Sequence, residues 1–256
     1  MTRDHHVSKK RLDSILVDRA LVPSREQAGR VILAGLVTVN GLIVDKRAKL
    51  IDEAAAIEVA DRSSSFVSRA GDKLAAAIEA FHVPCQGLIS MDIGASTGGF
   101  TDCLLRHGVK RVYAIDVGYG QLDWGLRNDS RVVVLERCNI RYLPVETIPE
   151  PIALVVIDVS FISLKLVLPC VVKFLSAQAI VIALVKPQFE AGRKQVGRGG
   201  IVRDDTVRQE VIDSVRSIAE ALGFCCLGHL DSPVKGKSGN REMLLGLRWG
   251  PESDLR

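Results

Sequence analysis

Apolar positions in the first sixty residues follow two spacings, and each spacing predicts a different element. Leu12, Ile15 and Leu16 lie at i, i+3 and i+4, the repeat of one helix face. A second helix is expected from Ser24, which opens a capping-box pattern. Short strands are then expected on both sides of Asn40-Gly41, a two-residue hairpin signal. Together these elements predict a small α+β domain over residues 1–60.

Longer apolar runs begin after a polar stretch, residues 61–65, which we expect to be a linker. Beyond it, runs typical of buried strands alternate with amphipathic stretches typical of helices. This alternation predicts a doubly wound, mostly parallel sheet with helices on both faces. An α/β domain is therefore expected over residues 66–256. Its strand-like runs are residues 88–93, 112–117, 132–136, 152–159 and 179–185.

Composition and charge narrow the class of protein. None of the apolar runs in the 256 residues approaches the roughly 20 residues that a membrane-spanning helix requires. The six cysteines form no C-x-x-C pair, which fits a reducing cytoplasm and argues against a disulfide or zinc framework. The five histidines have no metal-binding spacing. Ten basic residues against five acidic ones in the first fifty positions permit a nucleic-acid partner without requiring one.

A glycine-rich turn, residues 94–99, follows the first strand of the second domain. Asp116 follows the next strand, 24 residues after Asp92. Such a turn lets the backbone approach a nucleotide, and the second acid can accept both ribose hydroxyls. The spacing is neither that of a dinucleotide fingerprint nor that of a P-loop, which favours S-adenosylmethionine. The alternative is a tight structural turn. If the turn binds a ligand, a side chain at Gly94 is expected to occupy ligand space.

Charged residues close two further strands. Asp158 ends the fourth strand and Lys186 ends the fifth, so both are expected at the ligand-binding edge of the sheet. The alternative for this pair is a single salt bridge between solvent-facing strand ends. Two basic, glycine-rich loops, residues 190–203 and 235–241, are expected at the same edge. They are either phosphate-contacting loops or solvated surface loops.

These motifs resemble, in order and spacing, those of the TlyA, or haemolysin A, family. Residues 11–41 are similar to the alpha-L RNA-binding motif, and the second domain is similar to FtsJ-like Rossmann methyltransferases. The resemblance implies 2′-O-methylation of ribose in ribosomal RNA, at cytidines of ribosomal subunits, with S-adenosyl-L-methionine as the cofactor. It also implies a K-D-K-E catalytic tetrad, which maps to Lys73, Asp158, Lys186 and Glu242.

The expected site residues form three groups. In the tetrad, Lys186 is expected to act as the base or to stabilise the developing alkoxide, without a metal. The cofactor is expected at Asp92, Gly94, Ala95, Ser96, Gly98, Gly99, Asp116 and, by resemblance, Asn139. RNA phosphates are expected at Lys10, Arg11, Arg25, Lys46, Arg47, Arg193 and Lys194.

Two other functions stay open from the sequence. The family's second name suggests a membrane-lytic protein, but no spanning segment supports it. An inactive methyltransferase fold would leave an RNA-binding assembly factor, and the intact tetrad argues against that. The expectation is therefore a cytoplasmic enzyme, and no feature argues for a homodimer. Cys225 and Cys226 are expected in the core, and His82 and His107 at helix ends.

Overall fold

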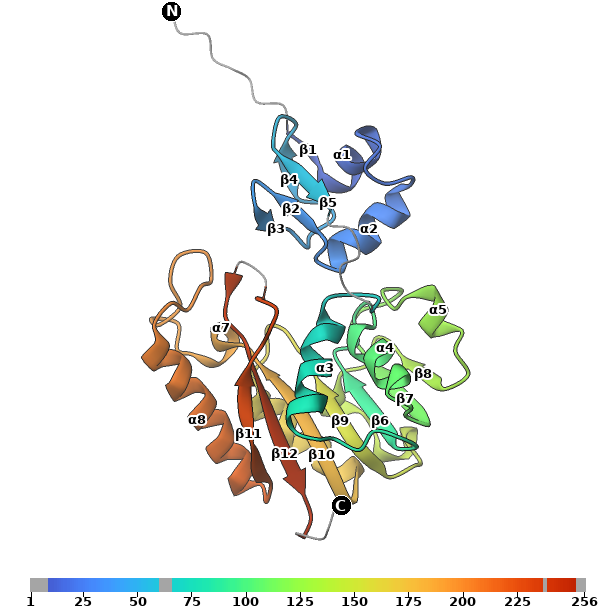
Figure 1. The fold of residues 1–256 in the computed structure, drawn as a ribbon, viewed down its shortest axis with the longest axis vertical. Coiled ribbons are helices and arrows are strands. Elements are labelled where there is room, and N and C mark those ends of the chain that lie inside the picture. The colour runs from blue at the N-terminus through green and yellow to red at the C-terminus, as the bar shows by residue number, and fades with distance from the viewer. Residues whose placement is uncertain (1–8, 60–65, 237–238, 252–256) are drawn as a thin grey trace, which may run out of the picture.

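The computed structural model describes residues 9–59, 66–236 and 239–251, so the expected linker at 61–65 lies outside the described residues. Two domains are stacked along the long axis of the molecule, with the small N-terminal domain above the larger C-terminal domain (Figure 1).

The N-terminal domain contains the predicted helices and hairpin. Helices α1 (Leu12–Asp18) and α2 (Arg25–Leu33) pack with a three-stranded sheet around a core that includes Leu12, Leu16 and Ile32. The side chain of Ser24 accepts the N–H of Gln27 at 3.2 Å, which satisfies a donor in the first turn of α2. Asn40 and Gly41 both have positive φ, as a two-residue hairpin needs. The sheet order is β3 (Leu42–Ile43), β2 (Val37–Val39) and β5 (Ile57–Val59).

One pairing in this domain is absent from the sequence prediction. Strand β1 (Lys9–Arg11) pairs antiparallel with β4 (Leu50–Asp52). All three residues of β1 are basic and exposed, so no apolar alternation marks the strand.

The C-terminal domain is built on a seven-stranded sheet of order β11-β12-β10-β9-β6-β7-β8. Numbered within the domain, this order is 6-7-5-4-1-2-3, and β12 alone runs against the others. The two halves of the sheet diverge between β6 and β9, the switch point where open α/β sheets form a crevice. The strands are β6 (Ile89–Ile93), β7 (Arg111–Ile115), β8 (Val132–Leu135), β9 (Ile152–Ile157), β10 (Leu175–Val185), β11 (Cys225–Asp231) and β12 (Met243–Trp249).

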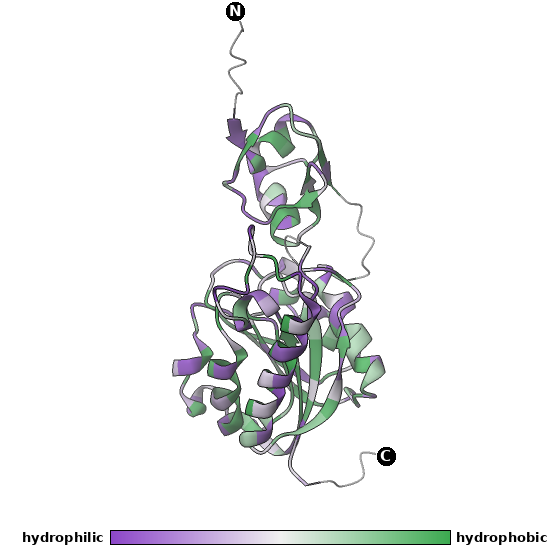
Figure 2. Cartoon of the chain, turned by 90° about the vertical axis from the view of Figure 1, so that its left-hand side faces the viewer, coloured by the Kyte–Doolittle hydropathy of each residue, from purple (hydrophilic) through white to green (hydrophobic). Residues whose placement is uncertain are grey.

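Helices cover both faces of this sheet, as expected for a doubly wound fold. One hydrophobic core lies between the sheet and helices α3 and α4, and the other lies between the sheet and helices α6 and α8. The strands are mostly hydrophobic, whereas the helices carry both hydrophilic and hydrophobic residues (Figure 2). The helices are α3 (Ala70–Ala80), α4 (Gly99–Arg106), α5 (Trp124–Arg127), α6 (Leu164–Val171), α7 (Pro187–Glu190) and α8 (Asp205–Ala221), with 3-10 turns at Ile140–Tyr142, Val145–Thr147 and Val172–Phe174.

The last two strands correct one sequence interpretation. Cys225 is exposed and Cys226 is half-buried, so the prediction that both lie in the core is wrong for Cys225. The physical reason is that β11 is an edge strand whose residues alternate between the two faces. His82 follows the C-terminus of α3 and His107 caps that of α4, as predicted.

Within the described part of the chain, no helix is long and apolar enough to span a bilayer. The same residues contain no group of three or more His, Cys, Asp or Glu side chains arranged to hold a metal ion.

Candidate active site

The glycine-rich turn lies at the switch point and is fixed by backbone contacts. The N–H groups of Gly94 and Ala95 both donate to the carbonyl of Ile115, at 2.8 and 3.1 Å. Gly94 has φ +88°, and a Cβ built there would lie 2.4 Å from the carbonyl oxygen of Asp158. A side chain at Gly94 would therefore meet the backbone of the neighbouring loop, which is a packing reason for this glycine beside the predicted one of ligand space.

The other glycines of the turn are also needed for packing. A Cβ on Gly98 would lie 2.3 Å from Leu126, and one on Gly99 would lie 2.2 Å from the hydroxyl of Ser68. Gly99 lets α4 begin directly against the segment that enters α3, and Gly98 lets the turn pack closely against Leu126 of α5. The turn is tight for structural reasons, and Gly94, Ala95, Ser96 and Gly99 still line a cleft at this edge.

Asp116 lies directly after β7, where its carboxylate is held by two backbone donors. Oδ2 accepts the N–H of Ser96 at 2.8 Å, and Oδ1 accepts the N–H of Gly118 at 2.6 Å. A carboxylate has about four lone-pair positions, so this arrangement orients the group and leaves acceptor capacity for ligand hydroxyls. The predicted ribose acceptor therefore stands beside the glycine turn.

Four predicted cofactor residues, Asp92, Gly98, Asp116 and Asn139, are not among the residues that line this cleft. Asp92 is fully buried, and its Oδ2 accepts the hydroxyl of Thr101 at 2.6 Å. Burial raises the pKa of Asp92 to about 7, and the nearby carboxylates of Asp158 and Asp116 add to the shift. Asn139 instead caps a 3-10 turn by accepting the N–H of Arg141 at 3.1 Å.

The four tetrad residues lie in one cleft as two ion pairs. Nζ of Lys73, on α3, lies 2.5 Å from Glu242, and both side chains are buried. Nζ of Lys186 lies 2.5 Å from Asp158, and it also donates to the hydroxyl of Ser160 at 3.0 Å. All four residues line the cleft together with the glycine turn. The alternative of an exposed strand-end salt bridge does not fit, because the Lys186 and Asp158 side chains are only 11% and 19% exposed.

The reversed strand explains how Glu242 reaches this cleft. Asp158 and Lys186 directly follow parallel strands, so their positions come from the strand ends. Strand β12 runs the opposite way, and its first residue, Met243, pairs with Val185 at the end of β10. Glu242, which precedes β12, therefore lies at the same edge as Lys186.

Comparison with known proteins agrees with this geometry. The profile of the FtsJ-like methyltransferases matches residues 66–249, and that of the S4 domain matches residues 10–57. The chain belongs to the FtsJ-like methyltransferase family. Its larger domain is the FtsJ-like domain, and its smaller one is the S4 domain.

Relatives and solved structures cover nearly the whole chain. The 16S/23S rRNA (cytidine-2'-O)-methyltransferase TlyA of Mycobacterium tuberculosis is 48% identical over 94% of this chain and 90% of its own length. Hemolysin A of Brachyspira hyodysenteriae is 44% identical over 91% of this chain and 98% of its own. A solved structure from Streptococcus thermophilus, provisionally named a hemolysin, is 43% identical with a TM-score of 0.74 and covers 97% of this chain and 92% of that one.

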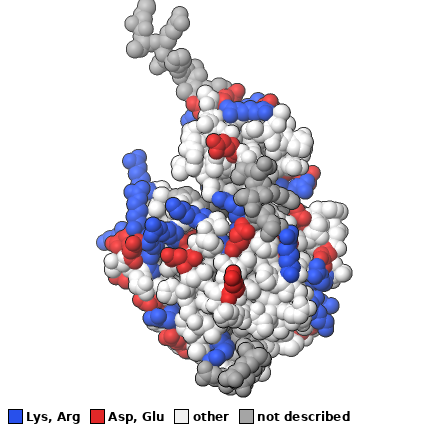
Figure 3. Space-filling model, in the orientation of Figure 1, with Lys and Arg blue, Asp and Glu red and all other residues white. Residues whose placement is uncertain are grey.

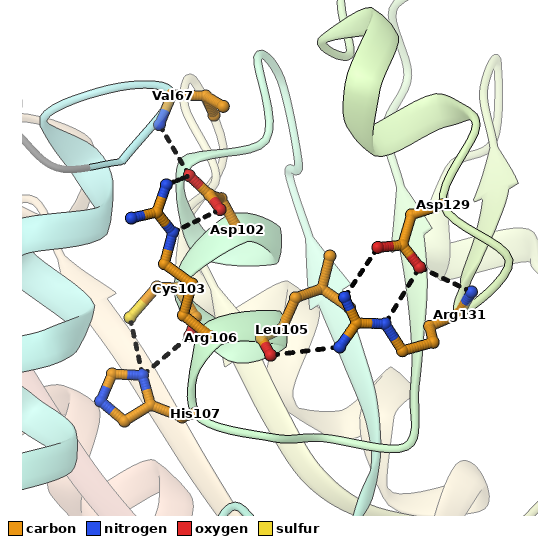
Figure 4. Close-up of polar contacts among 8 residues, drawn as sticks. All are labelled: Val67, Asp102, Cys103, Leu105, Arg106, His107, Asp129 and Arg131. Atoms are coloured by element: carbon orange, nitrogen blue, oxygen red, sulfur yellow. Dashed lines mark hydrogen bonds and ion pairs between the residues drawn. The ribbon is translucent and has the colours of Figure 1, made fainter.

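A polar anchor in the FtsJ-like domain positions the helix that carries Lys73. Asp102 on α4 accepts the backbone N–H of Val67 at 2.8 Å and binds Arg106 through both carboxylate oxygens (Figure 4). In the same view, Arg131 binds Asp129 and donates to the carbonyl of Leu105. The first anchor ties the entry of α3 to α4, so Lys73 is held against the glycine turn.

The predicted RNA-binding residues lie on two surfaces. On the S4 domain, Lys10 pairs with Asp18 and Arg11 with Asp13, yet about half of each basic side chain stays exposed. Arg25 donates to the hydroxyl of Ser14 at 2.8 Å, Lys46 is exposed, and the side chain of Arg47 packs over Gly29. Arg193 and Lys194 belong to the loop after α7, where basic side chains gather beside the FtsJ-like domain (Figure 3).

Sequence reasoning missed several cleft residues. Phe161 is 85% exposed with φ +65°, and its ring lies 5.0 Å from that of Phe189. The available signal was its position three residues after Asp158, because an aromatic residue beside a charged strand end is unusual for a solvated loop. The S4 domain also contributes lining residues, Leu33, Ala34, Gly35 and Ile43, which carry no sequence signal for a site.

Proposed function

We propose that this chain is an S-adenosylmethionine-dependent methyltransferase that acts on ribose 2′-hydroxyls of cytidines in ribosomal RNA. The observation that carries the proposal is the pair of lysine–carboxylate contacts in one cleft beside the glycine turn. A relative with this activity in its name is 48% identical over most of the chain.

The chain's own groups fit the proposed cofactor. Asp116 offers an oriented carboxylate for ribose hydroxyls, and residues 94–97 and 99 line the adjoining cleft. The bound cofactor would supply an electrophilic methyl group on a sulfonium, which leaves the protein to align and deprotonate the attacking oxygen. A solved N-methyltransferase, NodS from Bradyrhizobium japonicum with S-adenosyl-L-homocysteine, shares the fold at a TM-score of 0.50 and 17% identity, covering 70% of this chain and 86% of that one.

Lys186 is the proposed base. Nζ forms an ion pair with Asp158 at 2.5 Å and donates to the hydroxyl of Ser160 at 3.0 Å, and these two contacts would orient it toward the substrate hydroxyl. The bound cofactor would supply the methyl group, and Nζ of Lys186, once it has given up its own proton, would accept the proton of the 2′-hydroxyl. The Lys73–Glu242 pair borders the same cleft and positions the ribose.

The RNA substrate is supported by the S4 domain and by the exposed aromatic ring of Phe161. Exposed basic side chains on the S4 domain suit phosphate contacts, and an aromatic face at the cleft suits stacking of an unpaired base. The localisation proposed with this substrate is the cytoplasm, where ribosomal subunits are assembled.

The decisive experiment measures transfer of labelled methyl groups into purified small and large ribosomal subunits. Wild-type protein is expected to label at least one of them at the 2′-position of cytidine, while Lys186→Ala is not. Protein that binds cofactor but labels neither subunit would refute the proposal and favour an inactive assembly factor. Dye release from liposomes by the same protein would favour the membrane-lytic alternative instead.

A further inference from the structure

The catalytic cleft has one wall that does not come from the FtsJ-like domain. Leu33, Ala34 and Gly35, at the end of α2, and Ile43 on β3 line the same cleft as the tetrad. The S4 domain lies over the end of the sheet near which α7 is found (Figure 1). The S4 domain is therefore part of the cleft and not only a tethered module.

The two domains touch at a point close to Lys73. Gly35 has φ +69°, and a Cβ placed there would lie 3.1 Å from Nη2 of Arg69. Arg69 is the N-cap residue of α3, and Lys73 follows one helical turn later. Gly35, just after α2, thus lies next to the side chain of Arg69, at the start of the helix that carries Lys73.

The chemistry of this wall differs from that of the remaining S4 surface. Its four residues carry no charge, whereas basic side chains of the same domain lie elsewhere on its surface. An uncharged wall offers nothing to a phosphate, but it can cover the apolar faces of a sugar and a base. The lining residues from the FtsJ-like domain include the two ion pairs and Phe161.

We propose that Ile43, Leu33 and Ala34 of the S4 domain form the outer wall of the pocket for the target nucleoside. This inference rests on the proposed 2′-O-methyltransferase function. The wall packs against the sugar and base of the nucleotide whose hydroxyl reacts. It excludes water from that side and holds the ribose toward Lys186. The S4 domain therefore contributes to turnover of bound RNA as well as to RNA affinity.

The test compares two neighbouring residues of β3 in the full-length protein. Ile43 is half-buried and lines the cleft, whereas Leu42 is 65% exposed and is not a lining residue. Ile43→Ser is expected to lower kcat/KM for methylation of subunits about tenfold, the effect of losing a few apolar contacts in the transition state. The Kd values of Ile43→Ser for subunits and for cofactor should stay within about twofold of wild type. Leu42→Ser should have the wild-type kcat/KM, and Ile43→Val should keep most of it.

Wild-type kcat/KM in Ile43→Ser would overturn the inference. So would an equal loss of subunit affinity in the Leu42 and Ile43 serine variants, because the wall would then serve general RNA affinity only. If Ile43→Ser does not fold, Ala34→Glu places a charge in the same wall and should lower kcat/KM without weakening cofactor binding. A wild-type protein inactive on both subunits would instead refute the proposed function, which is a distinguishable result.

Discussion

Replacing Gly94 by alanine should distinguish two explanations for this glycine. One is close packing against the loop of Asp158, and the other is close approach of the backbone to a ligand. In Gly94→Ala the new Cβ would lie 2.4 Å from the carbonyl oxygen and 2.9 Å from the carbonyl carbon of Asp158, both backbone atoms that no rotamer change can move. The positive φ costs about 1–2 kcal/mol and the overpacking about 1–3 kcal/mol. We therefore expect a loss of roughly 2–5 kcal/mol in the free energy of unfolding.

The same steric clash should also lower the rate of methyl transfer. An ordinary contact needs more than 3.4 Å, so the loop must retreat by about 1 Å, and Asp158 holds Nζ of Lys186 at 2.5 Å. A misplacement of this size can lower a rate about 100-fold. Cofactor affinity should fall less than kcat, because Asp116 is held by the N–H groups of Ser96 and Gly118 and not by the Asp158 loop.

Gly87→Ala is the matched control. Gly87 also has positive φ, +75°, but nothing lies within 4 Å of its added Cβ, so this variant carries the backbone strain without the collision. Thermal and urea unfolding, cofactor calorimetry and methyl transfer are measured on both variants. If Gly94→Ala loses only cofactor affinity and keeps its kcat, the ligand-space explanation is right and the packing argument is refuted. Equal stability and activity in the two variants would refute both.

Three further outcomes follow from the site. Lys186→Ala should lower kcat about 10²–10⁴-fold while cofactor and subunit affinity stay unchanged. If Lys186 is the base, Lys186→Arg should be equally inactive. An active arginine variant would show that Lys186 acts by electrostatic stabilisation instead. Because burial raises the pKa of Asp92 to about 7, the native state binds a proton that the unfolded state releases near pH 4. The free energy of unfolding should thus fall by about 1.4 kcal/mol per pH unit from this group between roughly pH 4 and 7, and level off above. Urea unfolding of Asp92→Asn should lack that contribution; an identical pH slope in both proteins would contradict it. Finally, Lys10→Gln with Lys46→Gln should weaken subunit binding and reduce the slope of log Kd against log salt, whereas an unchanged slope would remove both lysines from the interface.

The fold was largely predictable because its signals are local. The apolar runs that predict β6 to β9 differ from the observed strands by one or two residues at their ends. Parallel order then placed Asp116, Asp158 and Lys186 at one edge without further information, since each directly follows a strand. In a buried parallel sheet, the sequence pattern of the strands therefore predicts those site residues that directly follow them.

Contacts between distant segments were not predictable in this way. The Lys73–Glu242 pair joins residues 169 positions apart, and only the family resemblance suggested it. The collision between Gly94 and the Asp158 carbonyl depends on how two loops approach across the switch point. The S4 wall depends on how two domains stack, and nothing in the periodicity of α2 or β3 encodes that arrangement.

The direction of β12 explains why Glu242, unlike Asp158 and Lys186, precedes its strand in the sequence. A search for polar residues directly after the strands finds Asp158 and Lys186. It does not find Glu242, which comes before a strand because β12 is antiparallel to its neighbours. A parallel β12 would have placed Glu242 at the opposite edge of the sheet. The buried ammonium of Lys73 would then lack the carboxylate that compensates its desolvation, a loss that is severe when one partner of a buried pair is removed. The antiparallel strand is therefore a condition for the second ion pair, and through it for a cleft in which each of the two lysines has its own carboxylate partner.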